Sequence, residues 1–171
     1  MQFKIGDKVV YPNQGIGEIR SIANHTIMGR EEDFYSLHIL ANDSTVMIPV
    51  NNVDNVGLRR LSSDRDLEEL FSVLRSENYE AGQDWKHRYK ENVEKMKSGC
   101  ILEVGSVLQS LYFLSFQKPL SFREKKMYDR ARRLVISEIS TVQQEPEGPV
   151  ETLVESILST AYAKYTAQAV G

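Results

Sequence analysis

Cysteine and histidine are scarce in this 171-residue chain, and their scarcity excludes several kinds of site. The single cysteine, Cys100, has no partner for an internal disulfide, which favours a reducing cytoplasm. The three histidines, His25, His38 and His87, lie in unrelated segments without the spacing of metal ligands, so we expect no metal. A P-loop is absent and no histidine–aspartate partner for Cys100 is identifiable, so we expect no catalytic residues, no cofactor and no enzyme.

Long hydrophobic runs are missing as well. The uncharged apolar stretches are a few residues long, far below the roughly 20 that cross a bilayer, so we expect no membrane segment. Met1–Lys4 leads directly into strand-like sequence, and we expect no secretion signal and a cytoplasmic location. The formal charge of −3 and the 41% of hydrophobic residues are typical of a globular protein with one or two domains.

Residues 1–60 have the pattern of a β-rich module. Short runs rich in Val, Ile, Tyr and Phe alternate with turn residues such as Pro12-Asn13-Gln14-Gly15 and Met28-Gly29-Arg30. The predicted strands are Phe3–Ile5, Lys8–Tyr11, Gly15–Ile22, Phe34–Leu40 and Ser44–Val50. Several short antiparallel strands in so few residues predict a small bent sheet or barrel, a size of module that binds more often than it catalyses.

The fifth predicted strand carries a candidate binding surface. Val46, Ile48 and Val50 share one face by the two-residue period of a strand, so Met47 and Pro49 lie on the other. Pro49 cannot donate a ladder hydrogen bond, which predicts an edge strand able to dock another chain. Periodicity alone equally allows Met47 to pack under a following helix.

From Leu61 the apolar period becomes that of helices. Four segments show it before residue 142: 67–74, 85–96, 101–112 and 121–139, the last opened by the capping box Ser121–Glu124. Glu145–Pro149 predicts a linker, followed by an amphipathic tail helix that should bury Leu153, Ile157 and Leu158 on its own bundle or dock elsewhere. The predicted class is α+β with two domains, a sheet in 1–60 and an all-α bundle in 61–142, with the tail in 143–171. We expect a monomer.

The only tryptophan, Trp85, stands at a predicted helix start beside Lys86, Arg88 and Lys90. A ring flanked by cations is the composition of a nucleic-acid wedge, in which the ring stacks on bases and the charges hold phosphates. Further along, residues 117–133 hold seven basic and two acidic groups. Burial statistics favour a different interpretation, in which Trp85 lies in the core and the basic helix is merely solvated.

At these residues the sequence resembles the CarD/CdnL family of bacterial RNA polymerase-binding transcription regulators. The similarity extends over residues 1–142. It is carried by Phe3–Asp7, Val9–Pro12, Gly15–Gly17, Met47–Pro49, Val56–Arg59, Trp85–Lys90 and Leu120–Lys126. The resemblance implies a Tudor-like N-terminal module that docks on the polymerase β subunit. It also implies a helical domain that meets promoter DNA at the upstream edge of the transcription bubble, with the tryptophan as a minor-groove wedge that stabilises the open complex without reading sequence.

Carried over by position, Leu37, Met47 and Pro49 match the polymerase-binding surface. The residues matching the DNA-facing patch are Trp85, Arg88, Lys90, Phe122, Arg123, Lys125 and Lys126. Some family members have arginine at the positions of His25 and Met47, so docking on the polymerase is expected to be more apolar here. Arginine is common at the position of His87, so one phosphate contact is expected to be weaker. The alternative function is a protein-only adaptor of the transcription machinery with no DNA contact.

Overall fold

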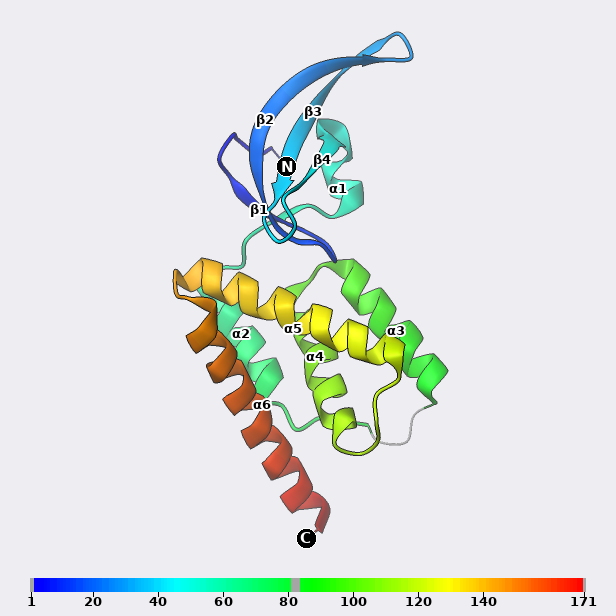
Figure 1. Cartoon of the computed structure of the whole chain (residues 1–171), viewed down its shortest axis with the longest axis vertical. Coiled ribbons are helices and arrows are strands. Elements are labelled where there is room, and N and C mark those ends of the chain that lie inside the picture. The colour runs from blue at the N-terminus through cyan, green and yellow to red at the C-terminus, as the bar shows by residue number, and fades with distance from the viewer. Residues whose placement is uncertain (1, 81–83, 171) are drawn as a thin grey trace. The chain divides into compact units, whose positions relative to one another are not determined.

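The computed structural model describes residues 2–80 and 84–170 and divides the chain into two compact units that meet between Leu61 and Ser62 (Figure 1). A bent antiparallel sheet forms the first unit and a bundle of helices forms the second. The predicted α+β class is therefore confirmed, with the sheet preceding the helices along the chain.

The first unit is built around a five-stranded sheet in the order β4-β3-β2-β1-β5. Its strands are β1 (Lys8–Tyr11), β2 (Gly15–Ile27), β3 (Arg30–Ile39), β4 (Ser44–Pro49) and β5 (Arg59–Arg60), and every neighbouring pair is antiparallel. A 3-10 turn (Val50–Asn52) and α1 (Val53–Val56) connect β4 to β5. One face of the sheet carries the core, which is formed by Phe3, Val9, Ile19, Tyr35, Leu37, Ile39, Ile48, Val53 and Leu58.

Two predicted strands differ from the structure. Residues 3–5 form no strand, because the Phe3 N–H donates to the Tyr35 hydroxyl at 3.0 Å and the two rings meet edge to face with centroids 5.9 Å apart. β2 and β3 are longer than predicted. Their paired residues run from Gly17 opposite Ile39 at one end to Ile27 opposite Arg30 at the other. The predicted turn at Met28-Gly29 therefore lies at the tip of a long hairpin.

The second unit has α4 (Ile101–Ser115) at its centre. α2 (Asp64–Arg75), α3 (Trp85–Ser98), α5 (Phe122–Gln143) and α6 (Glu147–Val170) all contact it. Nine residues of α4 are buried, among them Gly105, where an added Cβ would lie 2.5 Å from Leu70 Cδ1 of α2. No helix in the described part of the chain has both the length and the apolar composition needed to span a membrane.

The tail helix α6 packs on its own bundle, which confirms one of the two alternatives for it. Val150, Val154 and Leu158 are buried in the same core as residues of α2, α4 and α5, and Ala161 is buried as well. Leu153, which the apolar stripe placed in the interior, is 44% exposed and was assigned wrongly. On the polar side, Arg132 of α5 forms ion pairs with Glu151 and with Glu155 of α6, the latter at 2.7 Å.

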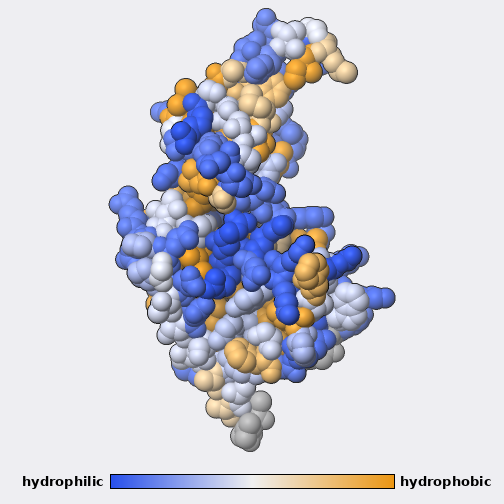
Figure 2. Space-filling model, viewed as in Figure 1, coloured by the Kyte–Doolittle hydropathy of each residue, from blue (hydrophilic) through white to orange (hydrophobic). Residues whose placement is uncertain are grey.

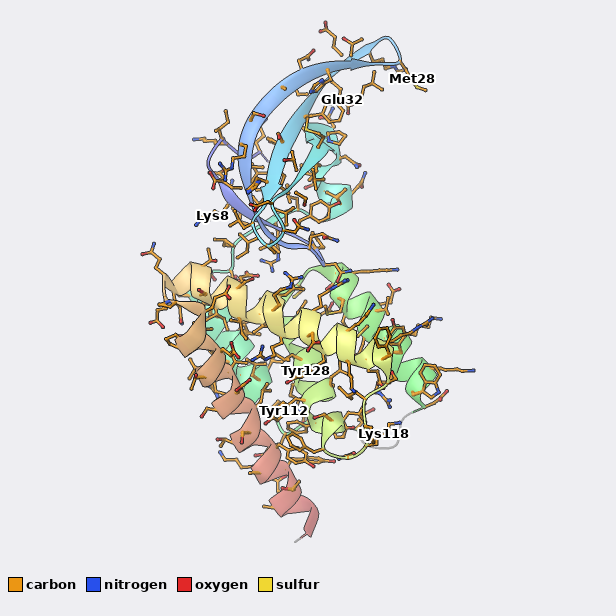
Figure 3. The ribbon with its side chains drawn as sticks, viewed as in Figure 1. Lys8, Met28, Glu32, Tyr112, Lys118 and Tyr128 are labelled. Carbon is orange, nitrogen blue, oxygen red and sulfur yellow. The ribbon has the colours of Figure 1, made fainter. Side chains whose placement is uncertain are left out.

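Aromatic side chains pack together where the last turn of α4 meets the second half of α6. Phe113 contacts Tyr162 and Tyr165 at centroid distances of 5.2 and 5.3 Å, and Tyr79, from the segment after α2, meets Tyr165 at 5.6 Å. Burial in this cluster raises the pKa of Tyr79 above its ordinary value. Figure 3 shows Tyr112 and Tyr128 on the neighbouring parts of α4 and α5. The aromatic contacts attach the second half of α6 to the bundle.

Candidate functional site

β4 lies at one end of the strand order, with β3 as its partner, so its outer edge is free within the described sheet. Ile48 lies opposite Tyr35, and both are 2% exposed on the core face. Met47, one residue earlier, points the other way and is 43% exposed. The predicted edge strand and the outward direction of Met47 are confirmed, and the alternative that packed Met47 under a helix is wrong.

Leu37, proposed as a polymerase-binding residue, does not reach the surface. It is fully buried and lies opposite Val46 and Ile19 on the core face of β3. A side chain without exposed area cannot contact a partner directly. The prediction that Leu37 binds polymerase is therefore wrong, and Leu37 belongs to the core of the sheet unit. Pro49 stays at the surface of β4 as a half-buried residue.

Trp85 is the first residue of α3 and follows the N-cap residue Asp84. Its side chain is 45% exposed. The interpretation that placed it in the core is therefore wrong. The inner face of α3 is formed by Arg88, Asn92 and Met96, each four residues after the last, and Trp85 stands at the N-terminal end of the same face, three residues before Arg88.

Arg88, proposed as a DNA-facing residue, is buried beneath that surface. It is 8% exposed, and its Nε and Nη2 atoms donate to Oε2 of Glu124 at 3.2 and 3.0 Å. Glu124 is itself 3% exposed. A guanidinium that is desolvated and paired with a carboxylate is not presented to a phosphate, so the assignment of Arg88 to the DNA-binding set is wrong.

Glu124 connects the starts of two helices. Its Oε2 atom accepts from Arg88 of α3, while Oε1 accepts from the backbone N–H of Ser121, the N-cap residue of α5. Ser121 Oγ accepts in return from the Glu124 N–H at 3.2 Å, which completes a capping box. The sequence predicted the box but not the ion pair, which joins residues 36 positions apart. The pair holds the first turn of α3 against the first turn of α5.

Exposed rings and cations surround this buried pair. Phe122 is 71% exposed and Lys126 Nζ lies 4.6 Å from the centroid of its ring, while the Arg123 guanidinium lies 5.9 Å from that of Tyr89. Lys90 and Lys125 are exposed too. Of the predicted DNA-facing residues, six are therefore at the surface of the two helix starts. We call them the aromatic–basic end: Trp85, Lys90, Phe122, Arg123, Lys125 and Lys126.

The aromatic–basic end has the composition for binding nucleic acid and lacks features of a catalytic centre. Its rings can stack on bases, and its ammonium and guanidinium groups can approach phosphates. Its cations Lys90, Arg123, Lys125 and Lys126 have no carboxylate within ion-pairing distance in the described residues. No group of three or more metal-ligating side chains occurs in residues 2–80 and 84–170.

Both units match family models. Residues 3–62 match the CarD-like/TRCF RID domain, and residues 69–155 match the C-terminal domain of CarD. The second match extends into α6, beyond residue 142, where the resemblance seen in the sequence ends. The chain is 29% identical over 150 residues to YdeB, a candidate transcription factor of Bacillus subtilis (strain 168), covering 88% of this chain and 98% of that protein.

Two solved structures are similar to the N-terminal part. CdnLNt from Myxococcus xanthus is 47% identical, with 37% of this chain and 90% of that chain covered at a TM-score of 0.32. The solution structure of the N-terminal domain of Myxococcus xanthus CarD is 32% identical, with 36% and 83% covered at a TM-score of 0.31. On the strength of the two family models, the chain belongs to the CarD/CdnL family, whose members are non-enzymatic transcription regulators that act with RNA polymerase.

Proposed function

We propose that this protein docks on the β subunit of RNA polymerase through β4 and stabilises the promoter open complex with its aromatic–basic end. The docking residues are Met47 and Pro49. Trp85 acts as a wedge in the minor groove at the upstream edge of the transcription bubble, without reading the sequence. The observation that carries the proposal is the exposed Trp85 at a helix start, which a buried ion pair holds against the start of α5 with its exposed Arg123, Lys125 and Lys126. Bound to polymerase, the protein lies on the nucleoid.

The energies involved suit a tethered contact. Unstacking a base step costs a few kcal/mol, and a ring that fills the gap returns about 1–3 kcal/mol. With a formal charge of −3 and few phosphate contacts, the protein should bind free DNA weakly. Docking on polymerase raises the effective concentration of the wedge at the bubble, so a weak contact becomes sufficient. The alternative function, a protein-only adaptor, placed the Trp85 ring in the core. The exposure of that ring supports the wedge over the adaptor.

Replacing Trp85 by alanine is expected to shorten the lifetime of the open complex at least several-fold. The reason is the loss of about 1–3 kcal/mol of base–aromatic stacking. The lifetime is measured by challenging preformed complexes with heparin on a promoter fragment, with the full-length protein present at saturation. Affinity for the β subunit should not change, because that contact belongs to the other unit.

Phe116→Ala is the matched control, since Phe116 is another exposed aromatic residue, at the C-terminal end of α4 outside the aromatic–basic end. The control variant should leave the lifetime unchanged. Circular dichroism must show that the Trp85 variant is folded. A folded Trp85→Ala protein that binds polymerase and keeps the wild-type lifetime would exclude the wedge.

Replacing Met47 by glutamate is expected to abolish detectable binding to the β subunit. A carboxylate on the outer face of β4 would have to lose its water in an apolar contact, which is strongly unfavourable. Binding is measured by titrating labelled protein with purified β subunit. Ile5→Glu is the control, because Ile5 is 65% exposed in the same unit but lies outside the strands. If Met47→Glu and Ile5→Glu lost binding equally, β4 would not be the docking edge. The same conclusion would follow if a folded Met47→Glu protein kept its affinity for the β subunit.

A further inference from the structure

The sheet unit holds the chain up to Arg60, the last residue of β5. The backbone of Arg60 pairs with β1. Its guanidinium donates to the Gln2 carbonyl oxygen at 3.1 Å, and it lies 5.2 Å from the centroid of the Phe3 ring. A second guanidinium nitrogen lies 3.8 Å from Asp7 Oδ2. These contacts, all within the first unit, fix Arg60, which Leu61 alone separates from the second unit.

The helical unit holds the chain from its first residue, Ser62. This residue is 8% exposed, and its backbone N–H donates to Glu138 Oε2 at 2.9 Å. Its hydroxyl donates to the same oxygen. Glu138 belongs to α5 and is 2% exposed, although hydrophilic residues predominate on the outer side of that helix (Figure 2). Burying a carboxylate is costly unless hydrogen bonds replace its water, and Ser62 supplies two of them. We call these two bonds the Ser62–Glu138 clasp.

The start of α2 does not require the clasp. Ser63, the N-cap residue, and Asp66 bond to each other's backbone N–H groups in a capping box, with N···O distances of 2.9 and 3.1 Å. A capping box by itself supplies hydrogen bonds that begin a helix. The clasp fixes instead the residue before the cap. Leu61 is then the one residue between Arg60, which is fixed in the sheet unit, and Ser62, which is fixed in the helical unit.

We infer that Glu138 is a positioning residue for the wedge, because its bonds to Ser62 restrict the free link between the two units to Leu61. The inference rests on the proposed function, in which one unit docks on polymerase and the other contacts DNA. The effective concentration of a tethered group depends on the length and stiffness of its link. Releasing Ser62 would raise the number of free residues from one to two, and each free residue loses backbone entropy when the wedge enters the DNA.

Replacing Glu138 by leucine is expected to shorten the open-complex lifetime about fivefold or more, the factor that corresponds to fixing the backbone of one more residue. Leucine fills a similar volume but cannot accept from Ser62, so the link gains a free residue. Glu138→Gln keeps an acceptor oxygen and should retain the wild-type lifetime within about twofold. The lifetime is measured by heparin challenge with the full-length protein at saturation. Affinity for the β subunit should not change in either variant, because that contact belongs to the sheet unit.

An insertion separates the clasp from damage to the bundle. Three residues of glycine and serine placed between Leu61 and Ser62 lengthen the link while Glu138 is unchanged. The insertion should shorten the lifetime at least as much as Glu138→Leu does. Adding Glu138→Leu to the insertion should then have no further effect, because the link is already free. If Glu138→Leu shortened the lifetime by the same factor with and without the insertion, it would act within the bundle and the clasp would be refuted. A lifetime that the insertion leaves unchanged would refute it too, since the length of the link would not matter.

Trp85→Ala, measured in the same assay, distinguishes this inference from the proposed function. If Trp85→Ala shortens the lifetime and a folded Glu138→Leu protein does not, the clasp is refuted and the wedge stands. If Trp85→Ala has no effect while Glu138→Leu does, the wedge is refuted, and with it a clasp that positions the wedge. Circular dichroism shows whether Glu138→Leu is folded. Should it not fold, Glu138→Met takes its place, because a flexible thioether fits an irregular site and its sulfur is only a weak acceptor.

Discussion

Replacing Glu124 by alanine is expected to lower the free energy of unfolding of the helical unit by about 3–5 kcal/mol, the usual cost of breaking a buried ion pair from one side. Arg88 would keep its charge at a position that is 8% exposed, without the carboxylate that accepts from its Nε and Nη2 atoms. The α5 capping box would be lost in the same step. Urea unfolding followed by circular dichroism measures the change, which is a large share of the roughly 5–15 kcal/mol of a whole domain.

Glu69→Ala is the matched control, because the Arg65–Glu69 ion pair on α2 is exposed. Its Arg65 Nε and Glu69 Oε1 atoms are 3.8 Å apart. Exposed pairs contribute little, so this variant should unfold like the wild type. A second comparison adds Arg88→Ala to Glu124→Ala. Because the double variant also removes the buried charge of Arg88, it should be less destabilised than the sum of the two single variants. A Glu124→Ala protein as stable as the Glu69→Ala protein would contradict the buried pair.

The same pair determines where the proposed wedge stands. Arg88 follows Trp85 by three residues on α3, and Glu124 follows Phe122 by two residues on α5. An ion pair between the two first turns therefore fixes both exposed rings relative to each other, although it touches neither ring. Rigid placement matters for a wedge because a ring that is free to move loses entropy when it stacks. We therefore assign Arg88 to positioning the aromatic–basic end and not to contacting DNA.

The sequence predicted the features of this fold that depend on local patterns. The alternation of Val46, Met47 and Ile48 was sufficient to orient β4, since a strand directs successive side chains to opposite faces. The capping box at Ser121 correctly marked the start of α5, because its hydrogen bonds lie within four residues. In β3 the same alternation buries Tyr35, Leu37 and Ile39, whereas the family resemblance had placed Leu37 at the surface.

What the sequence could not predict depends on contacts between distant segments. No local pattern indicates that Arg88 pairs with a glutamate 36 residues away. In the sequence, Arg88 is one of several basic residues close to Trp85, and that pattern is typical of a nucleic-acid-binding surface. Trp85 precedes Arg88 by three residues, so the helical period alone places it on the same side of α3 as the buried Arg88, Asn92 and Met96. Its exposure follows from its position as the first residue of α3, where the bundle does not cover the ring, and this is a property of the packed helices.

Deleting residues 146–171 is expected to lower the melting temperature of the helical unit by about 10 °C or more. The deletion exposes the core surface that Val150, Val154 and Leu158 cover, and each buried aliphatic side chain contributes about 1.5–3 kcal/mol. For a unit of this size, each kcal/mol corresponds to roughly 2–4 °C or more. Differential scanning calorimetry measures the shift. Polymerase binding should be unchanged, because β4 belongs to the other unit.

Two substitutions in the intact α6 helix show whether that loss comes from packing. Leu158→Ala removes a side chain that is 1% exposed and should cost about 2–5 kcal/mol, whereas Leu153→Ala, at a side chain 44% exposed, should cost much less. If the ranking were reversed, Leu153 and not Leu158 would face the core. If the deletion left stability unchanged but abolished self-association in analytical ultracentrifugation, the apolar stripe would be a contact between two copies. The burial of Val150, Val154 and Leu158 against α2 and α5 predicts the first result, because a side chain enclosed by its own bundle has no surface left for a second copy.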